Sequence, residues 1–164
     1  MEKLKKFQTI PFMDIATEGE DANWGRIGKS TIFDLSVNAN TVTNDYIEDE
    51  NPTDEVTYYK PTLPQELAAY KGDPAFDYLY DMFYNLPVGT KTQRNVLIVF
   101  AGNIGTAEAP KFKAWKSLAT IVLKNFNTVD EKISFDINFG GSIEKGEATV
   151  TEGVPTFTAV KAQD

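Results

Sequence analysis

The chain of 164 residues contains neither histidine nor cysteine. Because imidazole and thiol side chains are missing, a Ser-His-Asp triad, a cysteine nucleophile and the usual zinc, haem and iron–sulfur ligand sets are excluded. No disulfide can stabilise the fold, so stability must come from packing, with assembly as a further source. Any catalysis would depend on carboxylate, lysine, tyrosine or hydroxyl groups.

Long apolar runs are also missing. The first residues, MEKLKKFQTIPFMDI, carry three lysines but no apolar core of a secretion signal. No segment approaches the roughly 18 apolar residues of a membrane helix, so we expect no membrane binding by this chain. With 41% hydrophobic and 24% charged residues the composition is typical of a globular protein, and the length predicts one domain over residues 1–164.

Positive charge is scarce: 24 acidic residues stand against 16 basic ones, giving a net charge of −8. An acidic surface repels phosphate backbones, so stable binding to nucleic acid is disfavoured. Six carboxylates lie between residues 40 and 60 with no basic residue before Lys60. Because like charges extend a segment, we expect a projecting loop or long hairpin at about 41–61.

Period-two alternation of apolar and polar residues predicts strands over 33–38, 133–139 and 147–151. The run VLIVF at 96–100 predicts a strand covered on both faces. We also predict a strand over 111–124, with a helix as the alternative, followed by a turn that Asn and Asp residues form near 125–130. Glycines at 140, 141 and 153 separate the last short strands.

A single segment has helical character. Asp73 can cap a helix that starts at Pro74, and Leu86-Pro87 ends it. Apolar residues follow at helical spacing: Phe76, Leu79, Tyr80 and Phe83. The sequence therefore predicts a mainly β fold, a β-sandwich or barrel-like domain with one flanking helix at about 74–85 that packs its aromatic stripe on a sheet.

Two segments imitate ligand-binding motifs. GKST at 28–31 matches the end of a phosphate-binding loop, but Asn23 replaces its first glycine and a strand pattern follows in place of a helix. Residues 136–147 have the spacing of a calcium loop, but both flanks alternate as strands do. We prefer a strand, turn and strand for the second segment and predict no cofactor.

Other candidate sites are weaker. Adjacent exposed carboxylates in 45–55 do not provide the defined separation that glycoside hydrolysis needs. Trp24, Trp115, Tyr58 and Tyr59 could form a stacking platform for sugars, although core or interface positions are commoner for such residues. No residue set requires catalysis, so we predict that the chain is not an enzyme.

The order of several short motifs is more informative than any one of them. In chain order they are WGRIG (24–28), Tyr46-Ile47 among acidic residues, YYKP (58–61), GDP (72–74) before the helix, VLIVFAG (96–102), KAWK (113–116) and IEKGEA (143–148). From about Lys6 to Ala159, this series resembles the major tail tube proteins of long-tailed, siphovirus-type bacteriophages.

The resemblance implies the tail-tube fold and a role as a virion structural protein. Six copies would form a ring, and stacked rings would form a hollow tube around a tape-measure protein, through which DNA passes in transit to the host. Further partners would be tail terminator and distal tail proteins, and assembly would take place in the bacterial host cytoplasm. Terminal arms at about 1–12 and 152–164 would join rings.

The resemblance also implies roles for particular residues. The long loop would contact a neighbouring subunit or ring through Asp45, Tyr46, Ile47, Glu48, Asp49, Glu50, Asp54, Glu55, Tyr58 and Tyr59. We expect Lys111, Lys113 and Lys116 to form salt bridges with that loop. Candidates for the lumen are the polar strand positions Asp34, Ser36, Asn38, Ser134, Asp136 and Asn138. Six copies would carry a net charge of about −48, and a negatively charged wall would repel DNA and let it slide through the tube.

Two alternatives remain open at this point. The chain could be the tube protein of a contractile injection or secretion system, which has a related architecture. It could also be a monomeric carbohydrate-binding β-sandwich that uses Trp24, Trp115 and nearby tyrosines.

Overall fold

The computed structural model describes residues 1–161. Within this range the chain forms strands, one α-helix and a short 3-10 turn, in the order β1 (Ile10–Asp14), β2 (Trp24–Arg26), β3 (Ala39–Asn44), β4 (Thr53–Tyr59), β5 (Thr62–Ala68), α1 (Pro74–Asn85), η1 (Gly89–Thr92), β6 (Gln93–Asn103), β7 (Phe112–Asn127), β8 (Lys132–Phe139), β9 (Glu144–Thr151) and β10 (Val154–Ala159). The fold is therefore mainly β with one flanking helix, as the sequence predicts.

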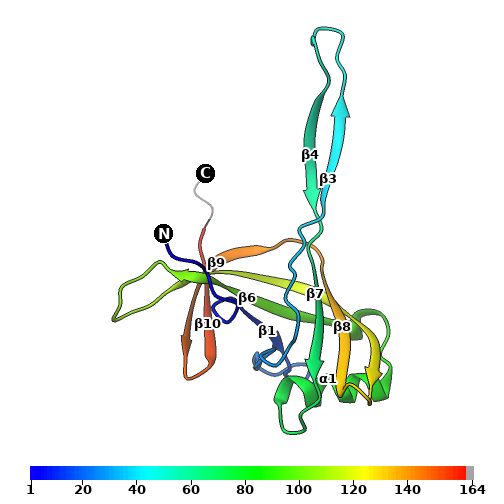
Figure 1. Cartoon of the computed structure of the whole chain (residues 1–164), viewed down its shortest axis with the longest axis vertical. Helices are drawn as coiled ribbons and strands as arrows, with labels where there is room; N and C mark the ends of the chain where they lie inside the picture. Colours follow the sequence, from blue (N-terminus) through cyan, green and yellow to red (C-terminus); the bar gives the residue numbers. More distant parts are fainter. Residues whose placement is uncertain (162–164) are drawn as a thin grey trace.

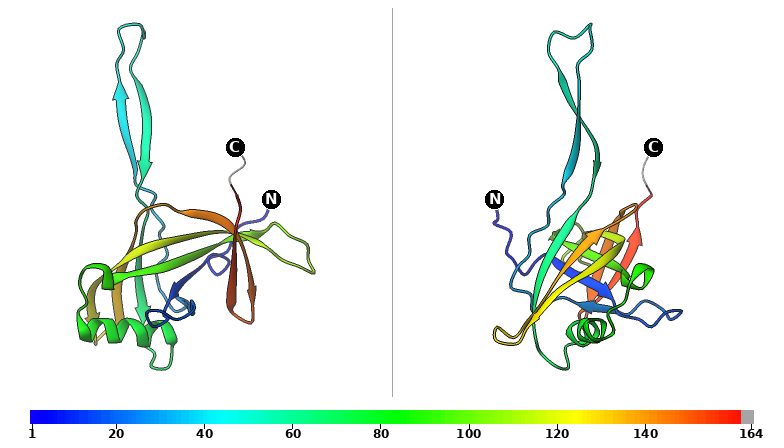
Figure 2. Two further views of the ribbon diagram at one scale, coloured as in Figure 1. Left: turned by 180° about the vertical axis from the view of Figure 1, so that it is seen from behind. Right: turned by 90° about the vertical axis from the view of Figure 1, so that its right-hand side faces the viewer.

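Eight of the strands form one antiparallel sheet that curls into a half-barrel (Figure 1, Figure 2). Its order is β10-β9-β7-β6-β1-β2, and β8 and β5 continue from β7. The long strand β7 pairs with β9 through its first residues, 112–116, and with β8 through residues 119–127. Because one strand serves two neighbours in succession, the sheet bends between them. Strands β3 and β4 form a separate two-stranded sheet.

Two apolar clusters cover opposite faces of the sheet. The larger lies under α1 and includes Leu79 with the inward side chains of β5 and β8. The smaller lies on the other face, where Phe12 packs with residues of β6, β7 and β9. Along β6, Val96 and Ile98 belong to the first cluster, and Leu97 and Val99 to the second. This confirms that the VLIVF strand is covered on both faces.

Helix α1 starts and ends where the sequence predicts. The Asp73 carboxylate accepts hydrogen bonds from the backbone N–H groups of Ala75 and Phe76, at 3.1 and 3.4 Å, and so satisfies donors that the helix leaves unpaired. At the other end Leu86 adopts a left-handed conformation with φ 48°, and its N–H donates to the Met82 carbonyl. Among residues 1–161 no helix is long and apolar enough to cross a membrane.

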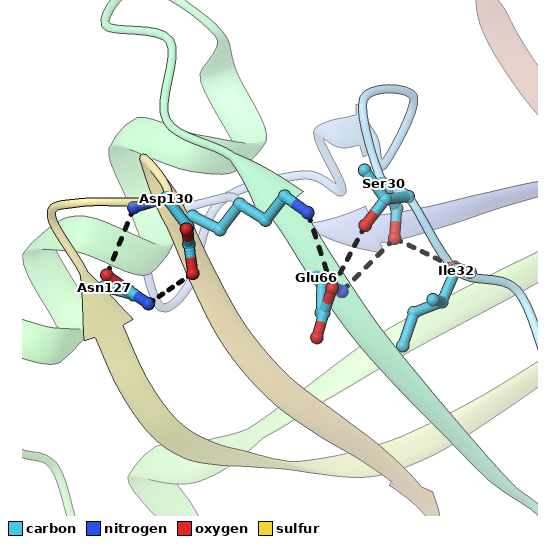
Figure 3. Close-up of polar contacts among 7 residues, drawn as sticks. Ser30, Ile32, Glu66, Asn127 and Asp130 are labelled. Carbon is cyan, nitrogen blue, oxygen red and sulfur yellow. Dashed lines mark hydrogen bonds and ion pairs between the residues drawn. The ribbon is translucent and has the colours of Figure 1, made fainter.

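The predicted strands near the C-terminal half are confirmed by β6, β7, β8 and β9, so the helical alternative for 111–124 is wrong. The turn after β7 is also present, where the Asn127 side-chain oxygen accepts from the N–H group of Asp130 (Figure 3). The same oxygen accepts from the N–H group of Val129. The strand predicted at 33–38 is wrong. Within that segment only Ser36 bridges to β5, at Thr62. The other bridge of this connection joins Ser30 to Leu67, so its register against β5 shifts by one residue between the two bridges and no continuous ladder forms.

Part of each predicted terminal arm belongs to the main sheet. Residues 10–12 of the expected arm at 1–12 belong to β1 and pair with β6. At the other end, residues 154–159 of the expected arm at 152–164 form β10 and pair with β9, while residues 162–164 lie outside the described part of the chain.

Candidate functional site: the β3–β4 hairpin and the polar sheet face

The hairpin β3–β4 projects from the body along the longest axis of the molecule (Figure 1). Its register runs from Ala39 opposite Tyr59 to Asn44 opposite Thr53, and residues 45–52 form the tip. Side-chain bonds support the ladder: the Thr43 hydroxyl donates to the Asp54 carboxylate at 2.6 Å, and the Asn40 amide donates to the Thr57 hydroxyl at 2.8 Å. The predicted projecting loop at 41–61 is therefore a long hairpin.

Large apolar and aromatic side chains are exposed along this hairpin, and Ile47 at the tip is fully exposed. The others are Val42, Tyr46, Val56, Tyr58 and Tyr59. A two-stranded hairpin is marginally stable alone, and its free strand edges can pair with another chain. No carboxylate of 45–55 has an ion-pair partner among residues 1–161. The hairpin thus carries both features of an unfilled interaction surface, exposed apolar groups and uncompensated charge.

A second surface is the face of β5, β7 and β8 that points away from α1. Here Ser134, Asp136 and Asn138 of β8 alternate with core residues and are half-buried. The register places Asn138 between Thr62 and Thr120, and it places Asp136 opposite Pro64 of β5 and Val122 of β7. We call this surface the polar sheet face.

Charge on the polar sheet face is compensated within the chain. The Lys124 ammonium lies 2.9 Å from one carboxylate oxygen of Asp136, and Lys132 lies 3.7 Å from Glu66. The other Asp136 oxygen is buried without a hydrogen-bond partner in the described residues. The two lysines offset the two carboxylates, so the face is polar rather than acidic. The sequence could not reveal these pairs, because they join different strands.

The other lumen candidates lie in the connection between β2 and β3. Ser36 exchanges two backbone hydrogen bonds with Thr62, at 3.0 and 2.8 Å, and the Asn38 amide donates to the Thr62 hydroxyl at 3.0 Å. Since Thr62 is opposite Asn138, the fold brings Ser36, Asn38 and Asn138 to one end of the polar sheet face. Asp34 is exposed in the same connection.

The three candidate lysines lie at the start of β7, where they have acidic neighbours in their own chain. Lys111 forms an ion pair with Glu147 at 3.4 Å. Lys113 and Lys116 are opposite Glu147 and Glu144 in the ladder with β9. Their charges are therefore partly compensated before any neighbour binds.

The structure does not bring the four candidate stacking residues together. Trp115 stacks edge-to-face on Phe100 with a ring distance of 4.9 Å, next to the cluster under α1. Trp24 packs on the other cluster, across the sheet. Tyr58 and Tyr59 lie on the hairpin. A sugar-binding platform built from these four residues is therefore not formed.

The two motif-like segments have structural roles. Ser30, within GKST, fixes the connection to β5: its hydroxyl donates to the Ile32 carbonyl at 2.9 Å and accepts from the Glu66 N–H at 3.3 Å (Figure 3). The calcium-like segment consists of the end of β8, a turn at Gly140-Gly141 and the start of β9. This is the strand, turn and strand arrangement preferred from the sequence.

One further site was not found from the sequence. A cavity of about 540 Å³ lies between residues 6–11, the connection 26–33 and Gln65 of β5. Gln65 is 1% exposed, and its side-chain oxygen has no hydrogen-bond partner in the described residues. The only sequence signal was a glutamine at a core position of β5, between Leu63 and Leu67.

Comparison with known proteins identifies the fold. No protein-family model matches the sequence, and no curated protein matches it either. Among solved structures, the chain is similar to one from the tail of an empty GTA particle (gene transfer agent), determined by helical refinement with C6 symmetry. The TM-score is 0.59 and the identity 12%, over 96% of this chain and 100% of the other.

A chain from the baseplate of the anti-feeding prophage (AFP), 6-fold symmetrised, is also similar, with a TM-score of 0.47 and 9% identity over 88% of this chain and 96% of that one. That score is too low to support an argument. At 12% identity the first similarity shows a shared fold, the tail-tube-like fold that the sequence predicts.

Proposed function

We propose that this chain is a structural protein that self-assembles into stacked hexameric rings and forms the tail tube of a phage or phage-like particle. The observation that supports this most strongly is the fold similarity to a GTA tail chain over nearly the full length of both chains. The projecting hairpin supports it independently, because its exposed apolar groups and free strand edges suit contact with another copy.

In this proposal, head-to-tail contacts close each ring and ring stacking continues the tube. The polar sheet face would line the lumen, since α1 covers the other face of the same strands. Ser36, Asn38, Asp136 and Asn138 would then present hydroxyl, amide and ion-paired groups to the conduit. DNA would pass along this surface without meeting a row of cations that bind its phosphates. The tape-measure protein would occupy the conduit before DNA does.

The hairpin would contact a neighbouring subunit or ring through its acidic tip and tyrosines. Lys111, Lys113 and Lys116 are one candidate basic surface for that contact. Because they face Glu144 and Glu147 in their own chain, we consider another basic surface below.

The decisive experiment is negative-stain microscopy of the purified full-length protein over a range of concentrations, with sedimentation velocity in parallel. We expect hollow tubes or six-fold rings. A variant in which Asn-Gly replaces residues 45–52 should keep a circular dichroism spectrum typical of β structure and should remain monomeric. A wild-type protein that stays monomeric at every concentration and salt would refute the proposed function. Tubes from the shortened variant would refute only the role of the hairpin.

A further inference from the structure

The cavity beside Gln65 has an unmet chemical requirement. The Gln65 amide nitrogen donates to the Pro64 carbonyl at 2.7 Å, which fixes the orientation of the amide and leaves its oxygen as the unpaired atom. Buried polar atoms are almost always paired, and this unpaired acceptor belongs to a residue that lines the cavity. Gln65 is therefore a polar residue beside the cavity whose hydrogen bonding is incomplete, and its oxygen is covered by the surrounding atoms.

The charge of the cavity indicates the kind of ligand. Its lining includes Lys6 and Arg26 and no carboxylate. Neither cation forms an ion pair within residues 1–161. The ligand should therefore be acidic.

The apolar part of the lining limits the ligand further. Phe7, Ile32 and Phe33 border the cavity and are exposed. Exposed apolar groups beside cations suit a segment that carries both a large apolar side chain and carboxylates. A small inorganic anion would leave Phe7 and Phe33 uncovered.

The hairpin tip has this combination. Ile47 and Tyr46 are exposed there, next to Glu48, Asp49 and Glu50. The tip points away from the body of its own chain (Figure 1, Figure 2), so it can reach this cavity only in another copy.

We propose that the hairpin tip of one copy docks in the Gln65 cavity of a second copy. Ile47 packs on Phe7 and Phe33, and tip carboxylates pair with Arg26 and Lys6. This inference rests on the proposed function, because it specifies the receptor for the hairpin contact. As the receptor for the hairpin tip, we favour this cavity over Lys111, Lys113 and Lys116, because those lysines already have acidic neighbours in their own chain.

The absence of cysteine allows a direct test by disulfide trapping in the full-length protein. An Ile47→Cys protein is mixed with a Phe33→Cys protein under mild oxidation during assembly. Two controls replace Phe33→Cys with Val122→Cys or Lys113→Cys. Phe33 and Val122 are matched in exposure, at 40% and 38%. Disulfides form only between Cβ atoms about 3.5–4.5 Å apart, so trapping reports direct contact.

We expect the Ile47–Phe33 pair to cross-link about tenfold faster than either control pair, a ratio that a modest preference in free energy produces. Equal rates for all three pairs, or faster trapping at Lys113, would overturn the docking proposal. If wild-type tubes form in either of those cases, the proposed function survives. If no association occurs at all, both proposals fail.

A second measurement tests the charge complementarity. One variant neutralises the tip by Asp45→Asn, Glu48→Gln, Asp49→Asn and Glu50→Gln. A matched control neutralises four exposed carboxylates elsewhere, Glu18→Gln, Glu20→Gln, Asp21→Asn and Glu108→Gln, so both proteins lose the same charge. Each variant also carries Ile47→Cys. We expect trapping to Phe33→Cys to slow about tenfold only with the neutral tip. An equal effect in both variants would overturn the proposal.

Discussion

Replacing Gln65 by leucine should stabilise the isolated protein, although most core substitutions destabilise. Gln65 occupies a core position of β5 between two leucines, and its side-chain oxygen is buried without a partner. An unsatisfied buried acceptor costs about 1–3 kcal/mol, whereas the lost hydrogen bond to the Pro64 carbonyl contributes about 0.5–1.5 kcal/mol. The difference predicts that the free energy of unfolding rises by about 1 kcal/mol.

The assay is urea unfolding of the monomer at low protein concentration, followed by tryptophan fluorescence. Ser117→Ala is the matched control, because Ser117 is the other buried polar residue in the described chain and its hydroxyl is paired with the Gly140 carbonyl at 3.1 Å. We expect Ser117→Ala to lower the free energy of unfolding by about 1 kcal/mol. If Gln65→Leu lowered the free energy of unfolding by about 1 kcal/mol or more, the Gln65 oxygen would have a partner in the monomer, and the reasoning would be refuted.

Four further substitutions, one of them a control, test the fold, each by the same urea assay. Leu79→Ala removes a fully buried contact between α1 and the sheet and should lower the free energy of unfolding by about 2–5 kcal/mol. A decrease of less than about 1 kcal/mol would show that α1 is not packed on this core. Asp73→Ala removes the helix cap and should cost about 1 kcal/mol, with the helical circular dichroism signal reduced. Gly146→Ala places a methyl group against the Thr158 carbonyl oxygen and 2.7 Å from the Phe157 ring, and it should lower the free energy of unfolding by about 1–3 kcal/mol. In the control Gly140→Ala, the nearest atom to the added methyl group is the Leu118 carbonyl oxygen at 3.8 Å, so the stability should not change; equal stabilities of the two variants would contradict this packing.

Features encoded by adjacent residues could be predicted from the sequence. The bounds of α1 follow from Asp73, Pro74 and the helical spacing of apolar residues, all within one segment. The covered strand β6 was also predictable, because its continuous apolar run requires packing on both faces.

Features that depend on distant pairing could not be predicted. The segment 33–38 has the alternation of a strand but bridges to β5 only at Ser36, because its register against β5 is interrupted, and alternation alone does not reveal that. The sharing of β7 between β8 and β9 is a property of the sheet. The same limit applied to the candidate surfaces. The lysines that neutralise Glu66 and Asp136 come from other strands, so the polar sheet face could not be distinguished from an acidic one.

The short junction between the hairpin and the body has a mechanical consequence. Only two residues, Lys60 and Pro61, separate β4 from β5, and β5 runs on in the direction of β4 (Figure 1). A pull on the tip would act along the axis of β5, nearly perpendicular to its hydrogen bonds with β8. All of those bonds would then resist together in shear, rather than opening one after another. Tension at a single point would thus be distributed over the whole edge of the domain.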